Sequence, residues 1–146
     1  HGIIPLSKAD SCMADIQTVF THYSADMRAL EISTGFLLTT IHNNEFVIEP
    51  LWFWPDTIES IHREIVESSV RRRHKTFPPN PDARALVEQM RKELKVVFCN
   101  AGATHLQIGR AYGYANTLDK NTLALLKGIK SFVDPTNKIN PGCLGL

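Results

Sequence analysis

The feature that most constrains the fold is a pair of alternating segments separated by a short turn. Over residues 30–40 the even positions carry mainly large apolar side chains, and the odd positions begin with charged or small ones. Residues 42–45 read His-Asn-Asn-Glu, which is typical of a turn because Asn tolerates positive φ. Alternation resumes over residues 46–54. We therefore predict a β-hairpin over residues 29–53, in which Pro50 marks an edge or a bulge of the second strand.

Apolar residues at helical spacing lie on both sides of this hairpin. Asn80, Pro81 and Asp82 form an N-cap, a first-position proline and a first-turn acid. Residues 104–108 alternate weakly and predict a short strand, whereas residues 136–146 contain too many turn formers for regular structure. Helices are predicted over residues 8–21, from Pro55 with Ile58, Ile61 and Ile65 on one face, from Pro81 with Ala83, Leu86, Met90, Leu94 and Val97, and from Thr117 with Leu125, Leu126, Ile129, Phe132 and Val133 as the buried side.

The order of these elements is helix, strand, strand, helix, helix, strand, helix. This order favours an α+β fold in which helices cover one face of a small antiparallel sheet. The other face of the sheet would then be open to a partner.

Composition narrows the class of protein. The chain has 146 residues, and 16 Lys+Arg against 15 Asp+Glu leave a net charge of +1, which argues against nucleic acid or an anionic membrane as the main partner. Three widely spaced cysteines fit a reducing compartment. Neither a transmembrane run nor a leader peptide is visible, so we expect a cytoplasmic protein. The chain starts at His1 inside an apolar segment, and we expect a piece of a longer protein.

The segment 102–110 is the best candidate for chemistry. On a short strand, His105 and Gln107 would share one face beside glycine residues that let a partner approach closely. A histidine there is suited to proton transfer, and Arg110 could hold a carboxylate. A purely structural role for this segment is the alternative.

Two other segments have open alternatives. The aromatic segment with Trp52 and Trp54 could line a pocket for an apolar or aromatic ligand, or pack on a neighbouring domain or helix. The basic segment 71–75 could bind phosphate or nucleic acid, but it lacks interleaved aromatic residues and is interpreted as a solvated connector. The six histidines show no metal-ligand spacing, and no metal site is predicted.

Residues 126–142 resemble the C-terminal ending of FAD-linked oxidases of the vanillyl-alcohol oxidase and p-cresol methylhydroxylase superfamily, which includes flavin subunits of D-lactate dehydrogenase and glycolate oxidase. The shared pattern is a helix with Ile-Lys, then Asp-Pro, then Asn-Pro-Gly. Residues 104–110, with Tyr112 and Tyr114, are similar to the segment that precedes that helix in several members. The hairpin ending at Glu49-Pro50 with Trp54 also looks like the substrate domain of this family.

The resemblance implies that residues 1–103 form a substrate (cap) domain with a ferredoxin-like antiparallel sheet, and that residues 104–146 return to the FAD site. FAD itself would be bound mainly by an N-terminal domain of the same parent protein. The resemblance and the residue chemistry together suggest His105, Arg110 and Tyr112 as catalytic residues. Asn140, Pro141 and Gly142 would contact the cofactor, and substrate would be bound by Gln107, Tyr114, Trp52 and Trp54.

The expected function is oxidation of a small hydroxy acid or a hydroxylated aromatic by hydride transfer to flavin. His105 would be the base, Arg110 would orient the substrate anion, and Tyr112 or Tyr114 would hydrogen-bond it. The Gly-His-Xaa-Gly-Asp-Gly-Asn-Xaa-His segment that some members use for a divalent metal is absent, and the Pro-Gly ending is nearer the phenol-oxidising branch. The alternatives left open are a non-catalytic ferredoxin-like module that binds a ligand or partner, and assembly with a second copy of the chain.

Overall fold

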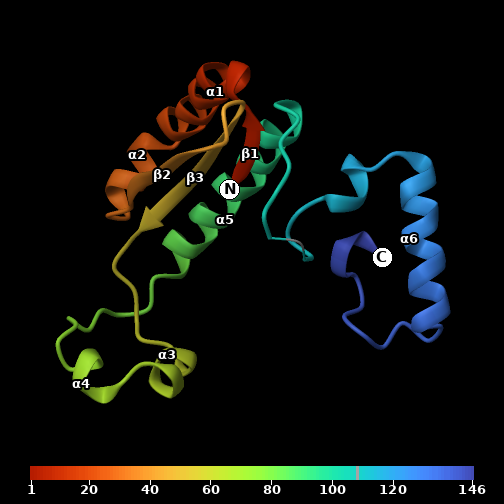
Figure 1. Cartoon of the computed structure of the whole chain (residues 1–146). Coiled ribbons are helices and arrows are strands. Elements are labelled where there is room, and N and C mark those ends of the chain that lie inside the picture. Colours follow the sequence, from red (N-terminus) through yellow and green to blue (C-terminus); the bar gives the residue numbers. More distant parts are fainter. Residues whose placement is uncertain (108) are drawn as a thin grey trace.

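The predicted hairpin forms the centre of the sheet. The computed structural model describes residues 1–107 and 109–146, and Figure 1 shows its elements. Strands β2 (Ser33–Ile41) and β3 (Glu45–Phe53) pair along their whole length, so the hairpin prediction is confirmed. His42 has φ 52 in the intervening turn. The sheet is completed by β1 (Gly2–Pro5), which pairs antiparallel with the other side of β3 and which the sequence pattern did not predict.

The predicted strand at 104–108 is reduced to a single bridge. Ile3 and Thr104 exchange two backbone hydrogen bonds of 2.8 and 2.9 Å. The same antiparallel register would place Leu106 opposite His1, but there the Leu106 N–H donates to the His1 imidazole instead of to backbone. Strand pairing ends for this reason, and the prediction that His105 and Gln107 share a strand face is wrong; Ile108 lies outside the described residues.

Three helices cover one face of the sheet. The core between the layers contains side chains from β1, β3 and the helices, with Ile4, Ile16, Ile48 and Met90 fully buried. The other sheet face leaves Leu37 49% and Phe53 58% exposed. The α+β prediction is therefore confirmed, and the order β-α-β-β-α, with Thr104 beside β1, follows the ferredoxin-like topology. The covering helices are α1 (Ala9–His22), α2 (Ser24–Ala29) and α5 (Pro81–Asn100).

Helix α5 begins as its capping residues predict. The Asn80 side chain accepts a 3.1 Å hydrogen bond from the Ala83 N–H, and Pro81 occupies the first turn. The buried face is rotated from the predicted one, because Leu86 and Val97 are only half-buried. The side chains that the core encloses are Ala83, Val87, Met90, Leu94 and Phe98.

The prediction of a helix from Pro55 with a buried isoleucine face is wrong. Only two short helices occur here, α3 (Ser60–Ile65) and α4 (Ser68–Arg71), and Ile65 is 73% exposed. The helix starts late because Glu59 is its N-cap: the Glu59 N–H donates 3.0 Å to the imidazole of His62, closing a capping box.

The carboxylate of Asp56 holds the segment before α3 in an extended form. It accepts hydrogen bonds from the Trp54 indole, from the Thr57 and Asn80 N–H groups and, at 2.7 and 2.8 Å, from Arg84. The Arg84 guanidinium is the main cause that holds the pKa of Asp56 well below its ordinary range, and the other donors add to this effect. One side chain thus ties the end of β3 to the start of α5.

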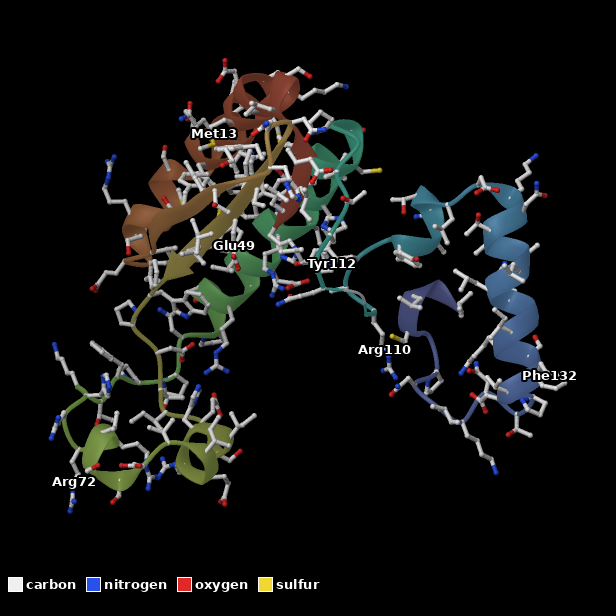
Figure 2. The ribbon with its side chains drawn as sticks, viewed as in Figure 1. Met13, Glu49, Arg72, Arg110, Tyr112 and Phe132 are labelled. Atoms are coloured by element: carbon white, nitrogen blue, oxygen red, sulfur yellow. The ribbon has the colours of Figure 1, made fainter. Side chains whose placement is uncertain are left out.

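The C-terminal segment forms a separate group of elements in Figure 1. Asp119 caps α6 (Lys120–Val133) by accepting from the Asn121 and Thr122 N–H groups, so the predicted start of this helix is confirmed. Its predicted buried side is not covered by the described residues, since Phe132 is 88% exposed and points into solvent in Figure 2. Two 3₁₀ turns flank it, η2 (Tyr114–Thr117) and η3 (Cys143–Gly145), within an otherwise irregular tail.

Across residues 1–107 and 109–146, no helix has both the length and the apolar character that spanning a bilayer requires.

We expect Asp56→Asn to lower the free energy of unfolding by about 1.5–3 kcal/mol, because charged hydrogen bonds to a partly buried carboxylate are lost. Denaturant unfolding followed by circular dichroism measures this. The carboxylate's pKa is depressed on folding, so its contribution is fully present above the ordinary aspartate pKa of about 3.9 and is lost as the pH falls below it. Asp15→Asn, on the exposed side of α1, is the matched control, and equal losses from both substitutions would contradict the role of Asp56.

Candidate functional site

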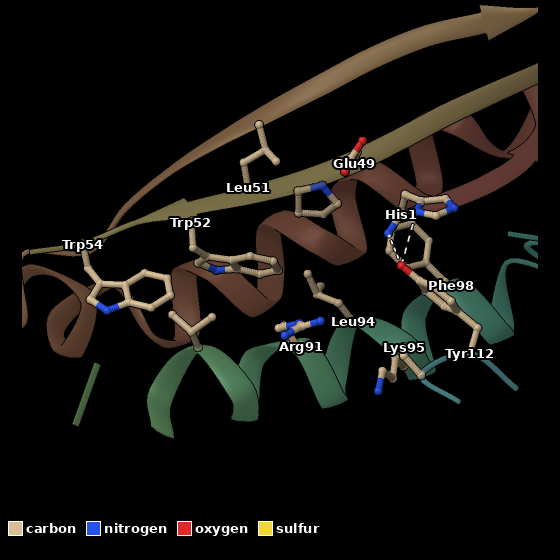
Figure 3. Close-up of a pocket in the computed structure, with 13 residues that line it drawn as sticks. His1, Glu49, Leu51, Trp52, Trp54, Arg91, Leu94, Lys95, Phe98 and Tyr112 are labelled. Carbon is tan, nitrogen blue, oxygen red and sulfur yellow. Dashed lines mark hydrogen bonds between the residues drawn. The ribbon is translucent and has the colours of Figure 1, made fainter. Parts of the chain in front are cut away.

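A cavity of about 250 Å³ lies between β3 and α5, and Figure 3 shows its lining. β1 pairs with β3 from Gly2, opposite Ile48, and β3 continues to Phe53. Among the described residues, the last part of β3 therefore has only β2 as a strand neighbour. The space beyond the start of β1 is bounded by β3, by the facing side of α5, by His1, and by Ala111 and Tyr112.

Pro50 lies just beyond Ile48, which is the last residue of β3 that pairs with β1. The Leu6 N–H donates 2.8 Å to the Asn44 carbonyl, and the same register directs the backbone groups of the even residues of β3 towards β1. Pro50 is an even residue beyond the end of β1, so its missing N–H removes no hydrogen bond from the sheet. The prediction that Pro50 marks an edge is confirmed at this position, although β3 is the central strand overall.

Two tryptophans form the aromatic wall of the cavity. Trp52 and Trp54 point from β3 towards α5 (Figure 3). The Trp52 ring also packs edge-on against Phe20, with ring centroids 5.9 Å apart, and its indole Nε1 is buried without a hydrogen-bond partner among the described residues. The Trp54 Nε1 donates 3.0 Å to Asp56. Both sequence interpretations therefore apply to Trp52: it packs on a helix and it lines a pocket.

The charged lining residues were not identified from the sequence. Arg91 and Lys95 reach the cavity from α5, one helical turn apart, and Glu49 borders it from β3. Arg91 has one ion pair, a 3.6 Å contact with the exposed Glu88. The pattern that could have indicated them is their position on the same stripe of α5 as the buried Leu94. The cavity thus combines aromatic walls with two cations.

His105 and Tyr112, which are distant from the hairpin in sequence, meet at one end of this cavity. Their rings stack with centroids 4.2 Å apart, and Tyr112 lines the cavity. The His105 Nδ1 lies 2.7 Å from the His1 carbonyl oxygen. A carbonyl oxygen can only accept, so Nδ1 carries the proton and the neutral ring keeps its lone pair on Nε2.

The electrostatics keep this pair neutral. Burial is the main cause that lowers the pKa of His105 and raises the pKa of Tyr112. The Tyr112 hydroxyl lies 3.2 Å from Nδ1 of His1. Because His1 Nε2 accepts from the Leu106 N–H, Nδ1 of the neutral His1 ring is the donor. The neutral His105 ring therefore has a free lone pair on Nε2, and burial opposes its protonation.

The other predicted site residues do not reach the cavity. Gln107 and Arg110 are exposed on the connecting segment, and Arg110 extends away from the sheet in Figure 2. Tyr114 is half-buried in η2. Asn140, Pro141 and Gly142 form an exposed turn of the tail.

The backbone conformation of this tail turn nevertheless favours the Asn and Gly residues that form it. Asn140 and Gly142 have φ values of 46° and 76°, in the left-handed region that Asn and Gly tolerate best. The Leu144 N–H donates 3.0 Å to the Gly109 carbonyl, so the tail returns to the connecting segment beside Arg110. The structure therefore groups the predicted residues in two places. Trp52, Trp54 and Tyr112 line the cavity, and His105 lies outside the lining but stacks on Tyr112. The others lie along the connecting segment and tail.

Within the described part of the chain, no three His, Cys, Asp or Glu side chains gather as metal ligands. Comparisons with protein-family models, with curated proteins and with solved structures find no match to this chain.

We expect Tyr112→Ala to raise the pKa of His105 towards its ordinary value of about 6.5, because the stacked ring provides part of the burial that opposes protonation. Imidazole NMR resonances followed through a pH titration measure this. In the unsubstituted protein, the lowered pKa means that stability decreases as the pH falls through the ordinary histidine range. Tyr114→Ala is the control, and a His105 titration that Tyr112→Ala leaves unchanged would refute the burial argument.

Proposed function

We propose that this chain is the substrate domain and C-terminal segment of an FAD-linked oxidoreductase that oxidises a small hydroxylated substrate. The observation that carries the proposal is that the residues of the family-like ending form one closed turn. Asp134 accepts from the Lys130 ammonium and, at 2.9 Å each, from the Lys138 and Ile139 N–H groups. These bonds lower the pKa of Asp134, the Lys130 contact most. The Lys130 ammonium also donates to the Ile139 carbonyl, so Lys130 and Asp134 hold the Ile-Lys and Asp-Pro parts of the pattern together up to the residue before Asn-Pro-Gly.

Only one surface of the described part of this chain, the tail turn around Gly142, is suited to contact FAD. A side chain added at Gly142 would meet nothing within 4 Å, so this turn is an open surface against which a cofactor held elsewhere can pack. The 250 Å³ cavity is below the usual volume for a drug-sized ligand and suits a single ring rather than a dinucleotide. FAD would therefore be held mainly by an N-terminal domain, and when bound it would supply the hydride acceptor.

The residues of this chain would bind the substrate and accept its proton. Trp52 and Trp54 offer flat apolar surfaces to a ring, and Arg91 and Lys95 offer positive charge to an acid or phenolate group. His105, neutral and with its lone pair on Nε2, is suited to take a hydroxyl proton. The cations of the cavity are better placed for the substrate anion than Arg110, which lies outside the lining.

Two uncovered apolar faces support docking to a partner domain. Along α6, Leu125, Ile129 and Phe132 are all at least half-exposed, and the open sheet face adds Leu37 and Phe53. Exposed apolar faces of this kind are typical of interaction sites. They agree with a chain that packs against an FAD-binding domain.

The second candidate is a non-catalytic module that binds a ligand in the same cavity. The limited size of this cavity and its aromatic walls favour it as much as they favour an enzyme. Only flavin content and turnover of the parent protein separate the two functions.

We expect His105→Asn in the flavin-containing parent protein to lower turnover about 100-fold or more, because the proton acceptor is lost. Flavin content, measured from visible absorbance, should change little, since His105 has no proposed contact with the cofactor. His42→Asn, in the exposed hairpin turn, is the matched control. Unchanged turnover in the His105 variant would remove it from the catalytic role.

We expect the isolated chain to retain no flavin but to bind a hydroxylated ring. The chain has 2 tryptophans and both line the cavity, so tryptophan fluorescence reports on a ring bound there. Trp54 also lines a neighbouring pocket with Arg71 and His74, so the titration is made without phosphate. Emission should change with 4-hydroxybenzyl alcohol at concentrations where D-lactate has no effect, because stacking requires a ring. A response to D-lactate alone would favour the hydroxy-acid substrate, and stoichiometric flavin on the purified chain would contradict the proposed location of the cofactor.

A further inference from the structure

The basic segment 71–75 and the helices before it line a second hollow, which shares no lining residue with the tryptophan cavity. Trp54 lies between the two, because it also lines a pocket with Arg71 and His74. The second hollow, of about 430 Å³, is lined by the cationic side chains Arg63, Arg71 and Arg72 together with His74. Hydroxyl groups of Thr57, Ser68 and Thr76 complete its polar lining, and no carboxylate belongs to it. Figure 2 shows Arg72 on the α4 part of the molecule, at the end opposite to α6.

These cations are not neutralised by the structure around them. None of the ion pairs formed within the described residues includes Arg63, Arg71 or Arg72. Among the neighbouring acids, Asp56 and Glu59 bind Arg84, and Glu67 accepts from the Ser69 hydroxyl. Glu64, which is next to Arg63 in the sequence, does not line the hollow and forms none of the ion pairs within the described residues. The Arg71 Nε is also enclosed, and it has no hydrogen-bond partner in the described part of the chain.

An enclosed guanidinium N–H without a partner is costly, and an anion would remove this cost. The lining contains three guanidinium groups, an imidazole and three hydroxyls, which are more donors than the two oxygens of a carboxylate can use. A phosphoryl group has three acceptor oxygens pointing in different directions, and arginine binds such groups in two-point contacts.

We propose that this hollow binds the phosphoryl group of a small phosphorylated molecule, such as a phosphomonoester or diphosphate. The site is independent of the proposed oxidase function and of the tryptophan cavity. The segment between β3 and α5 then has a binding role, in place of the solvated connector that its sequence predicts. Nucleic acid is disfavoured because the segment has no interleaved aromatic residues and the net charge of the chain is only +1.

The test is titration of the chain with inorganic pyrophosphate, followed by calorimetry and by the Nε–H NMR resonances of arginine. Arg71→Gln should weaken binding about tenfold or more, because it removes charge-assisted hydrogen bonds inside the hollow. Arg73→Gln removes the same charge from the same segment but does not line the hollow, and it should weaken binding less than about twofold.

The resonance shift of the Arg71 Nε–H provides a second readout in the unsubstituted chain, should a variant fold poorly. Equal weakening by Arg71→Gln and Arg73→Gln would show a general charge effect and overturn the proposal. An absence of both heat and resonance shifts would overturn it as well. Tighter binding of a single-stranded oligonucleotide than of pyrophosphate would also reject a small phosphorylated ligand.

Discussion

The arrangement of both candidate sites depends on one carboxylate, that of Asp56. It accepts from the end of β3 through Trp54, from the start of α5 through Asn80, and from the Arg84 guanidinium. β3 and α5 are the two walls of the tryptophan cavity, so this contact holds the walls together at one end. The chain between them leaves from the same point and encloses the basic hollow. A single partly buried ion therefore couples the positions of two sites that share no lining residue.

The sequence predicted those parts of the fold that local chemistry specifies. The hairpin follows from alternation and a turn, and the start of α5 follows from the Asn80 cap. The elements that the sequence did not predict correctly depend on contacts between distant parts of the chain. β1 is too short to show a period, and the strand beyond Thr104 ends because His1 intercepts the next backbone donor. The helix expected at Pro55 is displaced by the bonds of Asp56, two of whose partners, Asn80 and Arg84, are 24 and 28 residues away.

The candidate site was predictable only in part, for a related reason. Residue type drew attention to the tryptophans and to His105, and the structure places these side chains around one cavity or at its end. Arg91 and Lys95 were missed because their helix repeats charged residues along its exposed side, and only the position of α5 against β3 separates lining charges from solvated ones. Arg110 was expected at the substrate and lies outside the cavity lining, because the connecting segment turns towards the tail. Its role in binding stays a proposal.

Pro50 has a consequence for how copies of this protein behave at high concentration. A β-sheet with an uncovered border is a template onto which a foreign strand can add, and growth of this kind leads to fibres. Pro50 is the first residue beyond Ile48 whose backbone faces the β1 side of β3, and its ring replaces the N–H donor. A strand that pairs with β3 at this position therefore loses one hydrogen bond. Pro50 thus discourages the pairing of a second copy with this stretch of β3.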